Sequence, residues 1–283
     1  MKPFEAAVSL ARSHGLSVED PVVLRDLSNL LVHLRPSRVV ARVATTTAAA
    51  RAGGFEWLSR EVEVATFLAS RGAPVVPPAG ALPPGPHVHE GWAITFWRHV
   101  EHGPALDGAG VGEALRALHE ALAPYPGELP SLADVLDEAA GLIGRIPDGL
   151  RAGEPERLRR ALHRARSAVA AADLPERPLH GDAHAGNLLR TPARALWVDL
   201  EDTCHGPAEW DLACLVANAR VLGLNPAPGA AALAAYGRDP ADPALGAFVE
   251  ARALQVAVWT AFMAERHPAL RARARQRLAS LPA

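Results

Sequence analysis

The sequence predicts an α+β protein with a β-rich amino-terminal part and a larger, mostly helical carboxyl-terminal part. Short runs of β-branched residues, punctuated by Pro36-Ser37, predict a small antiparallel sheet near the amino terminus. From Val111 onward the apolar residues recur mostly at helical spacing. We therefore expect one part at residues 1–98 and a second part at residues 99–283.

The composition is that of a globular protein with a small-molecule partner. Hydrophobic residues make up 49% of the 283 residues and charged residues 21%, which excludes a disordered chain. The formal net charge of −2 offers no field that would draw nucleic acid or an anionic membrane. No apolar run resembles a signal peptide or reaches the length of a membrane span. We expect a cytoplasmic protein, a monomer or weak homodimer, without nucleic-acid or membrane partners.

In the amino-terminal part we expect a helix over residues 4–14, then three strands, and then a second helix opened by Gly53-Gly54 and ended by Gly72 and Pro74. A proline-rich loop at 74–86 and a linker at 98–110 enclose the last strand of this part. The expected strands are 22–24, 30–34, 39–43 and 92–97.

The carboxyl-terminal part is interrupted by one stretch that is not helical, between Pro178 and Asp202. The helices that we expect around it are 111–122, 131–144, 154–172 and 207–221, with further helices beyond. Within the interruption, Leu188-Leu189 and residues 196–198 can pair as a hairpin. This pairing predicts a site at the base of the hairpin.

Three polar side chains carry that site. The hairpin would set Asn187 and Asp199 at neighbouring strand ends, with Asp182 on the preceding loop. Carboxylate and amide oxygens suit Mg²⁺, and phosphoryl transfer needs a further carboxylate to orient the attacking hydroxyl. Protein kinases place an Asn five residues after their catalytic Asp, which is also the interval from Asp182 to Asn187. The pattern predicts transfer of a phosphoryl group from a magnesium-bound nucleoside triphosphate.

The histidines of this stretch allow another reading. His180, Asp182, His184 and Asp199 could bind a transition metal in a metal-dependent hydrolase. Histidines of soluble proteins more often donate a structural hydrogen bond. We favour the structural role, in which His180 and His184 brace the loop.

The motif resembles that of the aminoglycoside phosphotransferase family, which has the bilobal protein-kinase-like fold. The resemblance rests on three segments, His180-Gly181-Asp182-x-His184-x-x-Asn187, Val198-Asp199 and Gly206-Pro207-x-x-Trp210-Asp211. It implies a small sheet-containing lobe that binds ATP or GTP and a helical lobe that binds a hydroxylated small molecule. It also implies that Asp182 is the catalytic base, that Asn187 and Asp199 are magnesium ligands, and that Asp211 is a structural carboxylate.

The resemblance extends less closely to the amino-terminal part. It places the phosphate-binding cation at Arg42, where the family has a lysine, and the partner of that cation at Glu61. Lys2 is the only lysine, so the chemistry also favours Arg42. The loop that covers the phosphates would include Ser28 and contains no glycine. The strand that holds Phe96 would lead through Arg98 into a hinge that binds the purine.

The acceptor is left open by these residues, because members of the family phosphorylate aminoglycosides, macrolides, choline, sugars and homoserine. An antibiotic-inactivating kinase is therefore one possibility. The part after Asp211 has somewhat more arginines than carboxylates, which weakens the case for a polycationic aminoglycoside. Acidic contacts could still come from Asp134, Asp137 and Glu138. A third class, a nucleotide-binding protein without transfer activity, is suggested by the glycine-free loop and opposed by the presence of Asp182.

Overall fold

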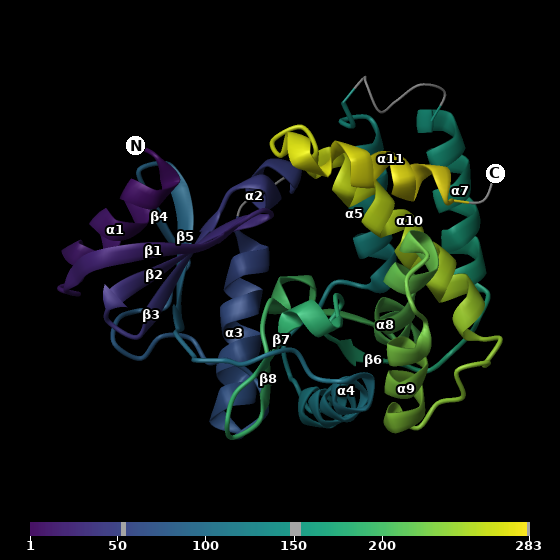
Figure 1. The fold of residues 1–283 in the computed structure, drawn as a ribbon, viewed down its shortest axis with the longest axis horizontal. Coiled ribbons are helices and arrows are strands. Elements are labelled where there is room, and N and C mark those ends of the chain that lie inside the picture. The colour runs from purple at the N-terminus through teal and green to yellow at the C-terminus, as the bar shows by residue number, and fades with distance from the viewer. Residues whose placement is uncertain (52–54, 148–153, 282–283) are drawn as a thin grey trace. The chain divides into compact units, whose positions relative to one another are not determined.

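The computed structural model describes residues 1–51, 55–147 and 154–281, and the chain divides into two compact units (Figure 1). The first unit comprises Met1–Pro104 and Leu189–Glu201, and the second comprises Ala105–Leu188 and Asp202–Ala283. The first unit thus runs past the boundary that we expected at residue 98. It also takes in the hairpin, which we had assigned to the second part.

A five-stranded antiparallel sheet forms the centre of the first unit, with the strand order β1-β2-β3-β5-β4. All the expected strands are present, and β1 begins earlier than its apolar residues indicate. The short strand β4 was not predicted, because three residues are too few for a recognisable alternation. The strands are β1 Val18–Asp26, β2 Asn29–Pro36, β3 Val39–Ala44, β4 His87–His89 and β5 Trp92–Arg98.

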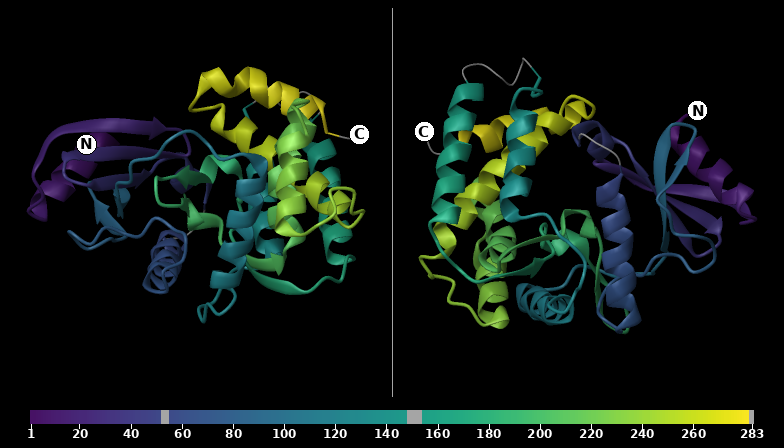
Figure 2. Two further views of the ribbon diagram at one scale, coloured as in Figure 1. Left: turned by 60° about the horizontal axis from the view of Figure 1, so that its bottom comes forward. Right: turned by 180° about the vertical axis from the view of Figure 1, so that it is seen from behind.

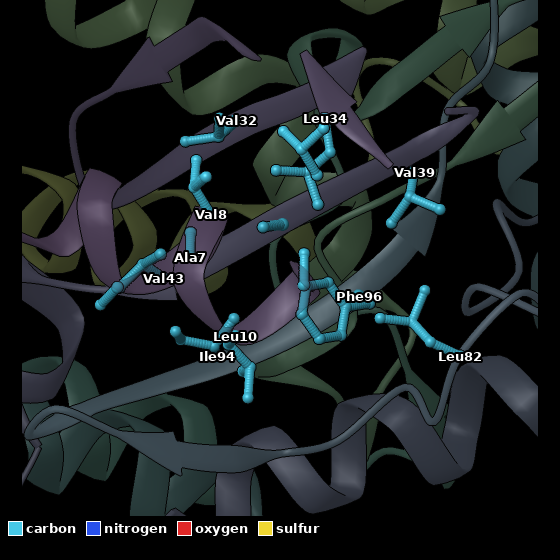
Figure 3. Close-up of a cluster of buried hydrophobic side chains, with 14 of the residues drawn as sticks. Ala7, Val8, Leu10, Val32, Leu34, Val39, Val43, Leu82, Ile94 and Phe96 are labelled. Carbon is cyan, nitrogen blue, oxygen red and sulfur yellow. The ribbon is translucent and has the colours of Figure 1, made fainter. Parts of the chain in front are cut away.

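One face of this sheet is buried under helix α1, Pro3–Ser13. Figure 3 shows the side chains of α1 packed against apolar residues of β2, β3 and β5. Side chains of a strand alternate between the two faces, so the burial of Ala41 and Val43 in this core places Arg42 on the opposite face. Helix α3, Glu56–Ser70, supplies Glu61 to Arg42 on that face.

Helix α2, Thr46–Ala50, was not predicted, because its run of threonines has low helix propensity. The expected opening of the next helix at Gly53-Gly54 lies outside the described residues.

The hairpin of β7 and β8 is attached to the segment that follows α3. Strand β7 spans Leu188–Arg190 and β8 spans Ala195–Trp197. The Trp197 N–H donates to the Pro74 carbonyl at 2.8 Å, and the Val76 N–H donates to the Trp197 carbonyl at 2.9 Å. These long-range backbone bonds explain why residues 189–201 belong to the first unit.

The second unit is built around helix α10, which packs against α5, α7, α8 and α11 (Figure 2). The residues of α10 are apolar on nearly every side of the helix, which is typical of a helix that neighbours cover on most sides. Two short antiparallel strands, β6 Glu176–Leu179 and β9 Cys204–Pro207, flank the predicted catalytic loop. No helix in the described parts of the chain is long and apolar enough to cross a bilayer. The helices are α4 Gly108–Leu122, α5 Leu132–Ile143, α7 Glu154–Ala170, α8 Glu209–Leu222, α9 Ala227–Tyr236, α10 Leu245–Met263 and α11 Arg271–Ala279.

Helix α4 begins at Gly108, inside the segment that we expected to be a linker, because Asp107 caps it by accepting the Gly110 N–H at 2.9 Å. Its glycines let it approach α9 closely. A Cβ atom on Gly112 would lie 2.0 Å from the Ala232 carbonyl oxygen. The two backbones are therefore in direct contact, and a larger residue cannot enter without separating the helices.

We predict that Gly112→Ala destabilises the protein by about 1–3 kcal/mol, because the added methyl group overpacks the α4–α9 contact. Gly141→Ala is the matched control, since Gly141 is also in a helix but has open space around it. The control should gain up to about 1 kcal/mol from helix propensity. Urea unfolding of both variants measures the difference, and equal effects would contradict the close packing.

Candidate active site

The loop after β6 is held in place by the buried carboxylate of Asp211, in the first turn of α8. The Asp211 carboxylate accepts the N–H of His180 at 2.8 Å and that of Gly181 at 2.9 Å. His119 of α4 contacts the same carboxylate through Nε2 at 2.8 Å. Burial alone would raise the pKa of Asp211, but the bonds from His119 and the nearby His180 hold it below its ordinary value.

Only glycine fits at position 181 of this loop. Its φ of +84° lies in the left-handed region, and an added Cβ would lie 1.9 Å from the Asp202 carbonyl oxygen. The indole Nε1 of Trp210 donates to the Gly181 carbonyl at 2.8 Å. The turn before Asp182 is thus defined by close backbone approach as well as by hydrogen bonds.

The carboxylate of Asp182 is contacted by three polar side chains of the second unit. Arg252 of α10 pairs with Asp182 Oδ1. The Asn187 amide donates to the Asp182 carbonyl at 3.0 Å and to its carboxylate at 3.2 Å. His184 Nε2 lies 3.5 Å from the same carboxylate. Although burial alone would raise the pKa of Asp182, Arg252 and His184 hold it well below its usual range. Asp182 is therefore an ionised hydrogen-bond acceptor at neutral pH.

The two histidines bond to the loop itself. His180 is fully buried, and its Nδ1 accepts the Asp182 N–H at 3.2 Å. His184 accepts the Gly186 N–H through Nδ1 at 2.9 Å. Among the described residues, no group of three or more His, Cys, Asp or Glu side chains could hold a metal ion. The hydrolase reading therefore has no ligand cluster to support it in the part of the chain that is described.

A second group of ionisable residues lies in the first unit, around Arg42 of β3. Arg42 pairs with Glu61, with Asp199 at 2.7 Å and with Glu201 at 2.5 Å. Burial alone would lower the pKa of Arg42, but these three carboxylates raise it above its ordinary value. Burial raises the pKa of Glu61 to about 7, against the opposing effect of Arg42. The guanidinium faces carboxylates on each of its amino nitrogens, so direct contact with a phosphate would require it to release one of them.

The amide of Asn29, on β2, extends this group. With its oxygen facing Arg42, the amide accepts from Arg42 Nε at 3.1 Å and Nη2 at 2.6 Å, and its nitrogen then donates to Thr47. Asn29 thus connects the buried arginine with helix α2.

Asp199 has the features of a functional carboxylate. It follows β8 and adopts a φ of +66°, which is unusual for a residue other than glycine. Its side chain is 28% exposed, whereas that of its partner Arg42 is 6% exposed. A carboxylate that is held by a buried arginine and still reaches solvent can bind a cation.

The three carboxylates around Arg42 do not by themselves form a group that could hold a metal ion, so a cation bound there would need further ligands. Glu61, Asp199 and Glu201 face two arginines, Arg42 and Arg51, the latter 3.6 Å from Glu201. The buried Glu61 Oε2 has no hydrogen-bond partner in the described part of the chain. Carboxylate oxygens are the donors that Mg²⁺ prefers.

Ser28 lies in the two-residue turn between β1 and β2, which helix α2 ties down. Its carbonyl accepts the Thr47 N–H at 3.1 Å and the Thr45 hydroxyl at 3.3 Å. The Thr46 hydroxyl donates to the neighbouring Leu27 carbonyl at 3.0 Å. The turn without glycine is therefore held by three successive threonines.

Phe96 and Arg98 are not available to a purine in the way that we expected. The Phe96 ring is completely buried in the core against α1. The Phe96 N–H donates to Pro84 and its carbonyl accepts from Ala79. The Arg98 N–H donates to Pro77 at 3.1 Å, although its side chain is exposed. The proline-rich loop thus uses the backbone groups that we had assigned to nucleotide binding.

Several residues of these groups were not among the predicted site residues, and two of them, Glu201 and Arg252, contact the predicted ones directly. Glu201 could equally have been a surface carboxylate of a turn, but its side chain is buried beside Arg42. Arg252 gave a signal that we did not use: apart from Glu250 it is the one charged residue of the otherwise apolar helix α10. Because arginine is rarely buried without a partner, such a position indicates a carboxylate nearby.

The fold is protein-kinase-like, and solved structures of small-molecule kinases resemble it over nearly the whole chain. Choline kinase LicA from Streptococcus pneumoniae is 16% identical with a TM-score of 0.71, covering 98% of this chain and 99% of its own. Amicoumacin kinase hAmiN, in complex with AMP-PNP, Ca²⁺ and Ami, is 14% identical with a TM-score of 0.70, covering 97% and 94%. Aminoglycoside phosphotransferase APH(3'')-Id from Streptomyces rimosus, in complex with ADP and streptomycin, is 19% identical with a TM-score of 0.65, covering 90% and 99%.

The chain belongs to the phosphotransferase enzyme family, whose sequence model matches residues 19–248. The matched region includes both groups of ionisable residues around Asp182 and Arg42, but ends before Arg252. No curated protein sequence matches the chain.

We predict that Arg252→Gln raises the pKa of Asp182 and lowers the free energy of unfolding by about 3–5 kcal/mol at neutral pH, because a buried carboxylate loses its cation. Asp182, whose pKa is lowered by folding, contributes stability above its unfolded pKa of about 3.9 and loses it as the pH falls toward its folded pKa. The variant should therefore lose more stability at pH 7 than at pH 3. Urea unfolding across this range, with ¹³C NMR titration of Asp182, measures both effects.

Two controls separate this ion pair from a general loss of charge. Arg252→Lys keeps the positive charge and should retain most of the lowered pKa. Arg220→Gln removes the exposed partner of Glu250, a residue of α10 like Arg252. This variant should change the free energy of unfolding by about 1 kcal/mol or less. An Arg252→Gln protein with an unchanged Asp182 pKa would contradict the assignment.

Proposed function

We propose that this chain transfers the γ-phosphoryl group of magnesium-bound ATP or GTP to a hydroxyl group of a small molecule. The observation that carries the proposal is the arrangement of Asp182 and Asn187. The Asn187 amide nitrogen holds the Asp182 carboxylate, and no donor among the described residues contacts the Asn187 amide oxygen. This leaves one ionised acceptor for a hydroxyl and one neutral oxygen ligand for a cation, as phosphoryl transfer requires.

Asp182 would orient the acceptor hydroxyl by accepting its hydrogen bond. Because Arg252 and His184 lower the pKa of Asp182, this carboxylate is a weak base. It would take the proton late, after the bond to phosphorus has largely formed, which suits a loose transition state. Positioning is therefore its main contribution to the rate.

Asn187 and Asp199 would be the protein ligands of Mg²⁺. When bound, the ion would neutralise charge on the β- and γ-phosphates. Arg42 would hold Asp199 in place and add positive charge near the nucleotide, and Glu61 would orient Arg42. This differs from a direct salt bridge between Arg42 and the phosphates, because the structure shows its amino nitrogens occupied by carboxylates.

The similar structures support a nucleotide and a small acceptor. One of them is a complex with AMP-PNP, Ca²⁺ and Ami, and another is a complex with ADP and streptomycin. They also include both antibiotic kinases and a choline kinase. Phosphorylation of an antibiotic is therefore one form that the proposed activity can take.

Asp182→Asn should keep nucleotide binding and reduce phosphoryl transfer by about 10²–10⁴-fold, because a neutral amide orients the hydroxyl less firmly than a carboxylate and cannot take its proton. The measurement is the rate of ADP release with acceptors found in a screen, and with water in their absence. Asp20→Asn, an exposed carboxylate that pairs with Arg35, is the matched control. A near wild-type rate in Asp182→Asn would refute the catalytic role, and no turnover in the wild type would favour a protein that only binds nucleotides.

Binding of ATP and GTP should depend on Mg²⁺, and Asp199→Ala should abolish that dependence. Isothermal calorimetry with and without Mg²⁺ measures it, and also distinguishes ATP from GTP. Glu63→Ala, an exposed carboxylate on α3, is the control and should behave as the wild type. Magnesium-independent binding, or no binding at all, would count against the proposal and favour a metal analysis of the purified protein.

A further inference from the structure

Arg277 of α11 has no anionic partner among the described residues, and it contacts α10, the helix whose Arg252 pairs with Asp182. Its Nη2 donates to the Asn218 amide oxygen of α8 at 3.1 Å. Its Nη1 contacts the Thr260 hydroxyl and the Val256 carbonyl of α10, the latter at 3.5 Å. All three partners are neutral, and the buried Nε has no partner in the described residues.

The charges near Arg277 are also positive. Its pKa is lowered to about 10 by burial and by the neighbouring Arg273 and Arg252. A pKa of about 10 still leaves the guanidinium charged at neutral pH. Residues 245–281 contain six arginines and two glutamates, so α10 and α11 supply little negative charge. The local potential therefore favours an anion and disfavours a cation.

The position of Arg277 along α10 relates it to Asp182. Val256 and Thr260 follow Arg252 by four and eight residues, which is about 6 and 12 Å along a helix. Arg252 itself pairs with Asp182. The α10 residues that contact Arg277 thus lie one to two helical turns from the residue that pairs with the carboxylate proposed to orient the acceptor hydroxyl. A small molecule is long enough to span one to two helical turns.

We infer that the acceptor carries an anionic group, a carboxylate or a phosphate, and that Arg277 binds this group while the hydroxyl of the same molecule meets Asp182. The inference rests on the proposed function, which supplies the role of Asp182. Asn218 and Thr260 orient the guanidinium, which otherwise would keep its rotamer freedom. Polycationic acceptors are disfavoured by the same charges.

A purely structural role for Arg277 would be to fasten α11 to α8 and α10. Its hydrogen bonds to three elements would serve that role too. The two roles differ in a measurable way. A structural arginine affects stability without discriminating between ligands by charge, whereas a binding arginine determines which charge is accepted.

The test uses four probes with one six-carbon polyol chain and different ends. Gluconate ends in a carboxylate, sorbitol 6-phosphate in a phosphate, gluconamide in a neutral amide and glucamine in an ammonium group. Calorimetric dissociation constants are measured at fixed ionic strength for the wild type, Arg277→Gln and Arg275→Gln. Arg275 is exposed on the same helix and gives the matched control.

We expect the wild type to bind at least one anionic probe at least tenfold more tightly than gluconamide, and glucamine most weakly. Arg277→Gln should abolish this preference, and Arg275→Gln should retain it. The tighter of the two anionic probes identifies carboxylate or phosphate as the preferred group. The inference is overturned if neither anion binds, if glucamine binds as well as the anions, or if the preference survives in Arg277→Gln.

Binding of Mg-ATP to the same preparations keeps the two hypotheses apart. If Mg-ATP binds and the charge preference is missing, the inference about the acceptor fails and the phosphotransferase proposal stands. If the charge preference is present and Mg-ATP does not bind, the phosphotransferase proposal fails and, with it, the assignment of the anion as part of an acceptor. Thermal unfolding shows whether Arg277→Gln is folded. If Arg277→Gln is unfolded, Arg277→Lys takes its place in the test. Because lysine keeps the charge, Arg277→Lys should keep part of the preference for anionic probes.

Discussion

The buried carboxylate of Asp211 is the interaction on which the candidate site of the second unit depends. A carboxylate without solvent is costly unless its oxygens accept hydrogen bonds, and those of Asp211 accept the N–H groups of His180 and Gly181 and contact His119. The loop can satisfy this carboxylate only if it turns sharply at Gly181, where a side chain would meet the Asp202 backbone. Asp182 then follows in the one conformation that brings it to Arg252 and Asn187.

Buried arginines hold both of the carboxylates to which we assign chemistry. Arg252 pairs with Asp182 in the second unit, and Arg42 pairs with Asp199 in the first. A guanidinium presents several N–H groups in one plane, so it can bond more than one carboxylate at once, as Arg42 does with Glu61 and Glu201. A lysine ammonium is a more compact charge with a different geometry. In a chain whose only lysine is Lys2, the charged groups are therefore arranged around planar, branched cations.

Local sequence patterns were sufficient to predict most helices and strands. They were insufficient to predict which residues contact each other. The sheet, the long helices and the hairpin of β7 and β8 agree with the periodicity and turn signals, because neighbouring residues determine these features. Helix α2 was missed because its threonines oppose a helix locally and gain their bonds from the β1–β2 turn. Phe96 was assigned to the nucleotide site by resemblance alone, and the proline-rich loop bonds to its backbone groups in the structure. These outcomes depend on segments that are distant in the sequence.

The sequence by itself determined the spacing of Asp182, Asn187 and Asp199 around a hairpin, and with it the class of chemistry that these residues can perform. Their spacing is local, and turn geometry translates local spacing into position. Only the tertiary structure decided which charges meet: Arg252 with Asp182 across 70 residues and Arg42 with Glu201 between the sheet and the segment after the hairpin. Within the described residues it gives Arg277 only neutral partners. Pairing of buried charges is a property of the packed state, since water screens the same groups in the unfolded chain and leaves no trace of the pairing in the local sequence.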